Sequence, residues 1–269
     1  MIKRILNKLR IPQKYKRKMN NREVIIPISH GIGLTNLHDA EPWMSHLLEK
    51  LGSAETRFLD VGINVGQTLL KWKTHFPTAP YVGFEPNKKC IEYLHSLIRL
   101  NHFENCKIHP YGLSTQANTG HLHLKGRDPA DSSASIIDGF RENEDRRKVP
   151  VELVPLTAID PQPFDLVKID VEGAELEVIQ TIFESTGRPI IICEILPIYH
   201  SKNHARLDRQ IALEKCLKDQ DYGLWRIRKT SPIQLEAIET IGIHDQIEDC
   251  DYVFMPTNAG DRINRNFKV

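Results

Sequence analysis

Apolar residues occur along the chain in two patterns. Short, almost wholly apolar runs end in a polar residue or glycine, as buried strands do, and most precede a stretch in which apolar residues recur at helical spacing. The first pattern predicts strands over 57–62, 81–85, 107–113, 164–170, 189–194, 224–228 and 252–255. The second predicts helices over 43–51, 65–76, 87–101, 174–183 and 205–217.

This alternation sets the expected fold class. Short buried strands that are each followed by a helix form parallel β-α-β units, in which helices cover both faces of the sheet. The order of the final elements favours an antiparallel hairpin. We therefore expect an α/β protein with a doubly wound, mainly parallel seven-stranded sheet and helices on both faces. Ligands of such sheets bind at the carboxyl ends of the strands, so functional residues are expected directly after them.

The start of the chain differs from the rest in charge. The first 18 residues contain eight lysines and arginines and no acid, and the apolar residues at 2, 5, 6 and 9 have helical spacing. A short basic amphipathic helix there could contact an anionic membrane surface or a polyanionic partner, and the alternative is a solvated, partly disordered tail. Residues 19–40 are predicted to be an irregular lead-in. We divide the chain into this arm with its lead-in, 1–40, and one domain, 41–269.

Composition narrows the classes of function. The 269 residues include 36 Lys and Arg against 35 Asp and Glu, a net charge of +1, whereas general nucleic-acid binders have a basic excess. No apolar run approaches the roughly 18 residues of a membrane-spanning helix. The five cysteines are scattered without a C-x-x-C pair, which argues against a zinc knuckle or redox dithiol. Since no secretory signal precedes them, we expect a cytoplasmic protein, with peripheral contact at the inner membrane surface if residues 1–18 bind lipid.

A glycine turn follows the first predicted strand. Asp60, Gly62, Asn64 and Gly66 form a D-x-G-x-N-x-G pattern that leads into a helix. The glycines permit a tight turn and a close approach of the backbone to a ligand, and the free N–H groups of the helix favour a carboxylate or phosphate. Asp60, at the strand end, suits a positively charged amine. The turn alone does not separate ligands, because dinucleotide-binding folds use related turns.

Glu85 makes the interpretation more specific. It ends the second strand, close to the offset of about 20 residues at which an acidic side chain meets ribose hydroxyls in this architecture. Together with the turn, it describes a site for a nucleoside whose other end is a small zwitterion. S-adenosylmethionine fits this description. NAD fits less well, since its pyrophosphate usually binds a denser G-x-G-x-x-G turn.

These residues resemble the FkbM family of methyltransferases, within the Rossmann-like class I S-adenosylmethionine-dependent fold. The resemblance runs from about residue 58 to 195 and covers four motifs in order, followed by C-E-I at 193–195. The motifs are F-L-D-V-G-I-N-V-G at 58–66, F-E-P at 84–86, Y-G-L-S at 111–114 and D-L-V-K-I-D-V-E-G-A-E at 165–175. The chain departs from the family at Ile63, where a small residue such as alanine is more frequent. We expect the larger side chain to narrow the cofactor turn.

The resemblance implies a role for each matching position. Glu85 would hold the ribose diol of S-adenosylmethionine with both carboxylate oxygens. The residues that would line the methionine end of the cofactor are Asp60, Gly62, Asn64 and Gly66, and those that would lie at the edge of the adenine are Gly112, Leu113 and Ser114. By analogy with the family, the acceptor would be a hydroxyl group of a sugar, a polysaccharide precursor or a polyketide-like metabolite.

Most of the residues that we expect to contact the acceptor lie in the motif around Lys168. Lys168 and Asp170 share one face of a strand, because side chains alternate between the two faces. Glu172 and Glu194 follow strand ends at the same edge of the sheet, and we assign Lys168, Glu172 and Glu194 to binding of the acceptor. Asp170 is a candidate for removal of the hydroxyl proton. His200, which follows a strand at this edge, is the rival general base because histidine titrates near pH 7.

Three further features qualify this interpretation. Asp170, Glu172 and Glu194 offer oxygen atoms that magnesium accepts, but their spacing matches no known metal loop, and we expect a metal-free site. Glu175 is expected only to favour the first turn of its helix. The polar stretch 125–148, with its serines at 132, 133 and 135, either closes over the acceptor or is a flexible loop.

The sequence therefore predicts an S-adenosylmethionine-dependent methyltransferase that acts on oxygen, with a small-molecule or glycan acceptor and no nucleic-acid partner. One alternative is an NAD(P)-dependent oxidoreductase that uses the same glycine turn. Another is a catalytically silent nucleoside-binding scaffold that is recruited through its basic arm. The sequence makes no prediction of the oligomeric state.

Overall fold

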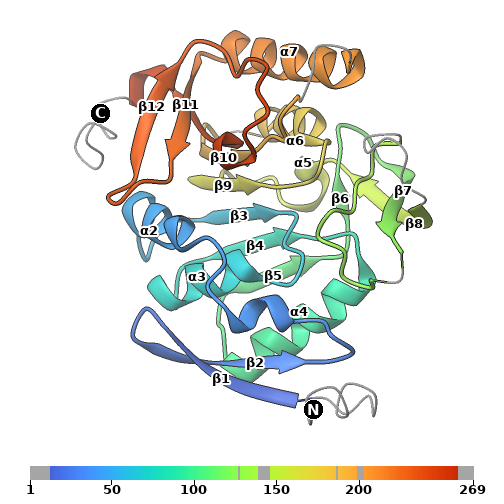
Figure 1. Cartoon of the computed structure of the whole chain (residues 1–269), viewed down its shortest axis with the longest axis vertical. Helices are drawn as coiled ribbons and strands as arrows, with labels where there is room; N and C mark the ends of the chain where they lie inside the picture. The colour runs from blue at the N-terminus through green and yellow to red at the C-terminus, as the bar shows by residue number, and fades with distance from the viewer. Residues whose placement is uncertain (1–12, 127, 139–145, 186, 199–202, 260–269) are drawn as a thin grey trace.

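The computed structural model describes residues 13–126, 128–138, 146–185, 187–198 and 203–259, and an eight-stranded sheet lies at its centre (Figure 1). Five neighbouring strands are parallel: β5 (Cys106–His109), β4 (Tyr81–Phe84), β3 (Phe58–Val61), β9 (Leu166–Ile169) and β10 (Ile190–Glu194). Beyond β10 the sheet continues with three antiparallel strands: β13 (Asp251–Pro256), β11 (Tyr222–Arg228) and β12 (Gln234–Ile238).

The predicted α/β class and mainly parallel sheet are confirmed, but the sheet has eight strands instead of seven. The additional strand is β12, at the edge of the sheet. Its residues Gln234 and Glu236 are exposed while Leu235 is buried. An edge strand that faces solvent contains no continuous apolar run, and this is why the pattern of buried strands did not include it.

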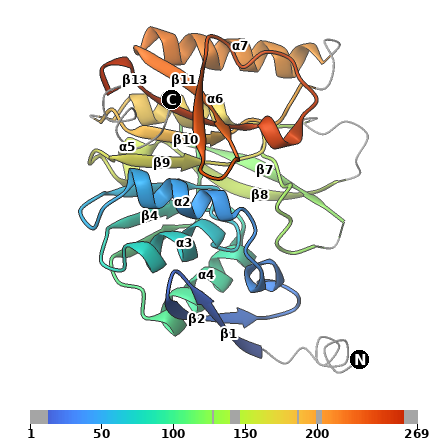
Figure 2. The same ribbon diagram turned by 60° about the vertical axis from the view of Figure 1, so that its left-hand side comes forward.

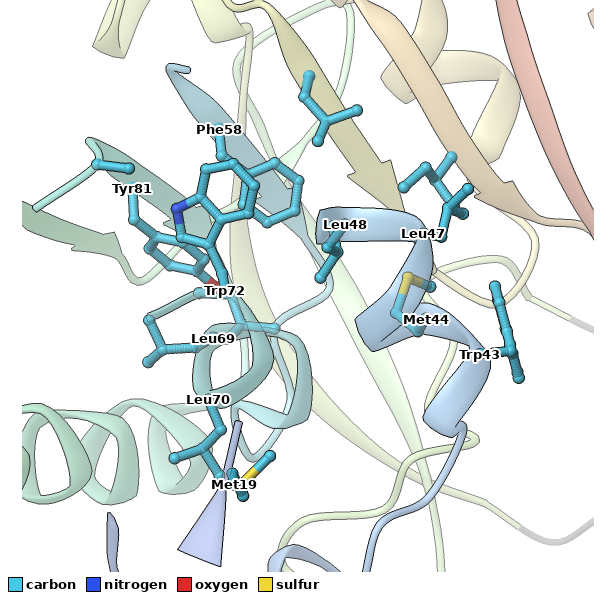
Figure 3. Close-up of a cluster of buried hydrophobic side chains, with 14 of the residues drawn as sticks. Met19, Trp43, Met44, Leu47, Leu48, Phe58, Leu69, Leu70, Trp72 and Tyr81 are labelled. Carbon is cyan, nitrogen blue, oxygen red and sulfur yellow. The ribbon is translucent and has the colours of Figure 1, made fainter. Parts of the chain in front are cut away.

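Helices cover both faces of the sheet, as predicted (Figures 1 and 2). Alternation along β3 divides the core: Phe58 belongs to one apolar cluster together with Trp72, and Leu59 belongs to the other together with Ile179. In the first cluster, the rings of Phe58 and Trp72 lie 4.5 Å apart, and Figure 3 shows them beside Tyr81. The first face carries α2 (Pro42–Leu51), α3 (Gln67–His75) and α4 (Lys88–Asn101). The second carries α5 (Leu156–Ile159), α6 (Glu175–Phe183) and α7 (His204–Asp219).

A small second sheet lies beside the carboxyl ends of the parallel strands (Figure 1). It consists of β6 (Gly112–Leu113), β8 (Arg146–Val154) and β7 (Asn118–Lys125), in that order. The predicted strand 107–113 is thus two strands in two different sheets. Because Leu122 of β7 reaches the central cleft, the second sheet forms part of the wall of the site.

The end of the predicted basic arm and the predicted irregular lead-in are partly regular. β1 (Gln13–Met19) and β2 (Arg22–Ile28) form an antiparallel hairpin, and its buried side chains join the core cluster of α4. The side-chain amide of Asn101 in α4 accepts from the N–H of Ile25 at 2.6 Å and donates to its carbonyl at 2.8 Å. The helix predicted near the N-terminus lies outside the described residues, and the boundary at residue 40 stays a prediction. In the described residues, none of the helices combines the length and the apolar character that a bilayer crossing needs.

Candidate active site

A cleft of about 960 Å³, part of it open to solvent, runs along the carboxyl ends of β3, β4 and β9. The predicted site residues that line it are Gly62, Asn64, Glu85, Gly112, Leu113, Lys168, Asp170 and Glu172. Asp60, Gly66, Ser114 and Glu194 are not among the lining residues. The position of the cleft agrees with the expectation from the strand order.

The glycine turn connects β3 to α3 and forms the floor of the cleft. Gly62, Asn64 and Gly66 all have positive φ, at 84°, 48° and 77°. The N–H of Gly62 donates to the carbonyl of Phe84 at 3.0 Å, which joins the turn to the end of β4. A Cβ atom at Gly66 would lie 2.8 Å from Leu94 of α4, so this glycine permits close packing of α3 against α4 and lies away from the cleft.

Glu85 is held at the end of β4 by backbone groups. Its Oε2 accepts from the N–H of Asn64 and its Oε1 from the N–H of Asn87, each at 2.8 Å. Burial raises the pKa of Glu85 to about 7, against the effect of these two donors. An ionised carboxylate accepts about four hydrogen bonds. One acceptor position on each oxygen therefore remains for a ligand with two neighbouring hydroxyl groups.

Asp60 is fully buried and does not reach the cleft. Its Oδ2 accepts from the hydroxyl of Tyr81 at 2.5 Å, and its Oδ1 lies 3.8 Å from Nζ of Lys168. Burial raises the pKa of Asp60, and Lys168 and the Tyr81 hydroxyl oppose this shift. Oδ1 has no hydrogen-bond partner among the described residues, and the predicted contact of Asp60 with a ligand amine stays a prediction.

Lys168 joins Asp60 to Asp170. Its Nζ donates to Oδ2 of Asp170 at 3.0 Å and lies 3.4 Å from the carbonyl oxygen of Gly62. Burial lowers the pKa of Lys168, but the two carboxylates outweigh this effect and the net shift is upward. The side chain of Asp170 is 35% exposed, so one carboxylate of this buried chain of charges reaches the cleft.

The segment that carries Glu172 is held by the second sheet. Glu172 has φ 54°, and its carbonyl oxygen accepts from the hydroxyl of Ser135 at 2.6 Å. Asp131 fixes the start of the same loop, because its Oδ2 accepts from the N–H of Lys125 at 2.6 Å and its Oδ1 from the N–H of Ser133 at 3.0 Å. Residues of this loop line the cleft, so it is part of the described wall, and its contact with an acceptor stays a prediction.

One predicted residue of the acceptor side, Glu194, does not line the cleft. Glu194, at the end of β10, accepts from the thiol of Cys250 at 3.5 Å and pairs in register with Asp251 of β13. Burial and the nearby Asp170, Asp251 and Glu172 raise its pKa to about 8. His200 lies outside the described residues.

Glu175 takes the structural role that the sequence predicts. Its Oε1 accepts from the N–H of Gly173 at 2.7 Å at the start of α6. Burial raises its pKa to about 7, and its side chain does not line the cleft.

At the predicted adenine edge, Gly112 and Leu113 line the cleft and Ser114 does not. The N–H of Ser114 donates to the carbonyl of Val154, as part of the second sheet. Ile63, the departure from the family pattern, is 4% exposed, and a Cβ at Gly83 would lie 2.3 Å from its Cδ1. Its side chain therefore fills the space above the glycine of β4, although Ile63 also borders the cleft.

Sequence reasoning missed several cleft residues. Glu41 lines the cleft from the segment before α2, and Leu122 and Ile136 supply apolar wall from or near the second sheet. No motif marks them, because they reach the site through long-range packing. No group of three or more His, Cys, Asp or Glu within the described parts of the chain is arranged to hold a metal ion.

The fold is the Rossmann-like fold that class I methyltransferases have. A Streptococcus mutans protein classed with the S-adenosylmethionine-dependent methyltransferases has this fold, with a TM-score of 0.50 at 10% identity over 91% of this chain and 55% of that one. The sequence profile of the methyltransferase FkbM domain matches residues 60–254, and the chain belongs to this family. The predicted family is therefore confirmed, and so is its cofactor, S-adenosylmethionine.

Two further proteins are similar to this chain. The methyltransferase sdnD of Sordaria araneosa is 31% identical over 155 residues, which are 47% of this chain. The chain spans only 60% of the length of that relative. The O-methyltransferase of Bacillus cereus, solved in complex with S-adenosylhomocysteine, has a TM-score of 0.48 at 11% identity over 83% of this chain and 86% of that one.

The described residues fit S-adenosylmethionine chemically. Glu85 has free acceptor positions for a ribose diol, and the apolar wall of Leu113, Leu122 and Ile136 suits an adenine ring. The cleft also carries carboxylates that can face a ligand ammonium or sulfonium group. The same residues form one continuous wall, so a single ligand can contact all of them.

Proposed function

We propose that this chain transfers a methyl group from S-adenosylmethionine to a hydroxyl oxygen of a sugar, a polysaccharide precursor or a secondary metabolite. The observation that carries the proposal is the placement of Asp170. Its carboxylate reaches the cleft that Glu85 also lines, and its Oδ2 is fixed by Lys168 at 3.0 Å. A positioned carboxylate beside a nucleoside site is what proton removal from a hydroxyl acceptor requires.

When bound, S-adenosylmethionine supplies an electrophilic methyl group. The residues of this chain must hold the acceptor oxygen in line with that group and receive its proton, and alignment of this kind can supply much of the rate acceleration. In our proposal, Asp170 accepts the proton through its exposed oxygen, Lys168 keeps the carboxylate oriented, and Glu172 binds neighbouring hydroxyl groups of the acceptor. Glu194 does not line the cleft, but its charge and that of Asp170 interact.

Family membership and catalytic turnover distinguish the proposed function from its alternatives. Membership of the FkbM family favours methyl transfer over a nicotinamide-dependent oxidation. His200 stays the rival base. A catalytically silent scaffold would bind the cofactor without turning it over.

The test is release of S-adenosylhomocysteine from the full chain with S-adenosylmethionine and a panel of neutral sugars, glycan precursors and polyhydroxylated metabolites. We expect release with at least one hydroxyl acceptor, and a product that is heavier by one methyl group and methylated on oxygen. Asp170→Asn should lower kcat roughly 100-fold or more while its affinity for S-adenosylhomocysteine is unchanged.

The matched control is Asp208→Asn, an exposed aspartate of α7, which should leave kcat unchanged. Methylation on nitrogen would contradict the hydroxyl acceptor. Full activity of Asp170→Asn would transfer the role of base to another residue, with His200 as the first candidate. Cofactor binding without turnover on any member of the panel would favour the scaffold.

A further inference from the structure

The amino group of the cofactor needs a carboxylate that the cleft can present. The sequence assigns this role to Asp60, which is 0% exposed and lies outside the cleft. Its two oxygens face the Tyr81 hydroxyl and the Lys168 ammonium group. Oδ1 of Asp60 has no hydrogen-bond partner among the described residues, but it is buried and does not line the cleft. An acid on the cleft wall is more accessible to the ligand ammonium.

Glu41 is an acid on the cleft wall that has no motif around it. It lines the cleft together with Gln67 and Thr68 of the first turn of α3, directly after the glycine turn. Among the residues that the structure describes, the side chain of Glu41 has no hydrogen-bond or ion-pair partner, and the residue is exposed. Its carboxylate is thus available to a ligand in the cleft.

The backbone at Glu41 is held in an unfavourable conformation. Its φ of 57° and ψ of 62° lie in the left-handed region, which non-glycine residues seldom adopt, and Pro42 follows it. The preceding carbonyl, that of Ala40, accepts from Nζ of the buried Lys71 at 2.6 Å, which ties the segment to α3. Such outliers persist where the surrounding structure imposes them, and they are frequent at ligand sites.

The carboxylate of Glu41 affects the pKa values of two buried groups, Lys71 and Asp251. Burial lowers the pKa of Lys71, and Glu41 is the largest opposing influence. Burial raises the pKa of Asp251 to about 6 against the attraction of Lys229, and the charge of Glu41 adds to that rise. The charge of Glu41 therefore acts on buried groups of α3 and of the start of β13.

We propose that Glu41 binds the α-ammonium group of S-adenosylmethionine, in the place that the sequence motif assigns to Asp60. The proposal depends on the proposed function in one respect, namely that the cleft holds this cofactor. The proposal adds a residue from the segment before α2 to the cofactor site. The other predicted residues of this site lie at or directly after the carboxyl ends of strands. Asp60 acts on the site only through Lys168.

The test compares two ligands by calorimetric titration of the full chain. One is S-adenosylhomocysteine, which has the α-ammonium group, and the other is its analogue with hydrogen in place of that group. The wild-type protein should bind the analogue roughly 10- to 100-fold more weakly, as expected for loss of a charge-assisted hydrogen bond. Glu41→Gln should bind S-adenosylhomocysteine more weakly by a similar factor and should no longer distinguish the two ligands.

The controls are Glu49→Gln, an exposed acid of α2 outside the cleft, and Asp60→Asn. Both should keep the wild-type ratio of the two affinities, even if Asp60→Asn is less stable. The inference is overturned if Glu41→Gln keeps that ratio, whether or not both affinities fall, or if Asp60→Asn abolishes it. A wild-type chain that binds neither ligand would instead overturn the proposed function, so the two failures can be distinguished.

Discussion

A Cβ atom at Gly62 would lie 1.8 Å from the carbonyl oxygen of Asp170. The glycine turn after β3 and the end of β9 are therefore packed backbone against backbone, and the N–H of Asp170 also donates to the carbonyl of Val61 at 3.0 Å. The segment that lines the cofactor side of the cleft and the segment that carries the proposed base form one rigid unit. This arrangement fixes the distance between the two halves of the site.

The first prediction concerns this contact. Gly62→Ala should lower the free energy of unfolding by more than about 1 kcal/mol, because it adds a backbone clash to the cost of positive φ. Urea denaturation measures the change. Gly242→Ala is the matched control: Gly242 has φ 75° and a Cβ atom there would meet nothing within 4 Å, so this variant reports the cost of φ alone. Equal losses in the two variants would show that the contact with Asp170 is unimportant.

The second prediction concerns the buried hydroxyl of Tyr81. Tyr81→Phe removes the hydrogen bond to Oδ2 of Asp60 and should lower the free energy of unfolding by about 1–3 kcal/mol, since a buried carboxylate loses its donor. Tyr222→Phe is the control, because its buried hydroxyl donates to the uncharged carbonyl of Pro189 at 3.0 Å. The loss should be smaller there. A larger loss for Tyr222→Phe would argue that Asp60 is uncharged in the fold.

The third prediction concerns Glu85. Glu85→Ala should reduce the affinity for S-adenosylhomocysteine by about 1–3 kcal/mol, because the ribose hydroxyls lose their acceptors. Calorimetric titration measures the affinity. Glu175→Gln is the control: its carboxyl is similarly buried, with a pKa of about 7, but it lies outside the cleft. It should affect stability and leave affinity unchanged. Unaltered binding by Glu85→Ala would remove this residue from the cofactor site.

The fourth prediction is a dependence of stability on pH in the ligand-free protein. Burial raises the pKa of Glu85 and Glu175 to about 7 and that of Glu194 to about 8, above the ordinary value of 4.5. Between these values the folded protein keeps protons that the unfolded chain has released, so stability falls as pH rises. Histidines whose pKa is lowered by burial, such as His109, act in the opposite direction only below their ordinary value of 6.5.

The free energy of unfolding should therefore decrease from pH 6.5 to pH 8, by roughly 1 kcal/mol per pH unit for each such acid that stays protonated. Urea denaturation at several pH values measures this slope. Glu194→Gln should flatten it, because the amide does not titrate. If the free energy of unfolding of the wild type stays constant or rises over this pH range, these carboxyl groups are more hydrated than their burial implies.

The hairpin before α2 has a local signal in the sequence that the prediction of an irregular lead-in did not use. Asn20 and Asn21 form the two-residue connection between β1 and β2, with φ of 45° and 61°. Two positive φ values are typical of the tight turns in β-hairpins, and asparagine tolerates them. The pair of asparagines between two extended runs would have predicted the hairpin.

The position of Asp60 in its strand contains a signal that the prediction of a ligand contact did not use. Side chains alternate along a strand, so Asp60 shares a face with Phe58, which lies in the core. The period of two alone indicates that Asp60 points toward the interior. That its partners there are Tyr81 and Lys168 depends on the neighbouring strands β4 and β9.

The sequence by itself determined the alternation of the parallel strands with helices, the glycine turn and the acid at the end of β4. These features depend on residues that are close along the chain, whose periodicity and backbone preferences are local properties. The tertiary structure alone decided that Glu41 and Ile136 reach the cleft and that Glu194 does not line it. Such placements follow from packing between segments far apart in sequence, where burial and charge are set by neighbours that no local pattern names.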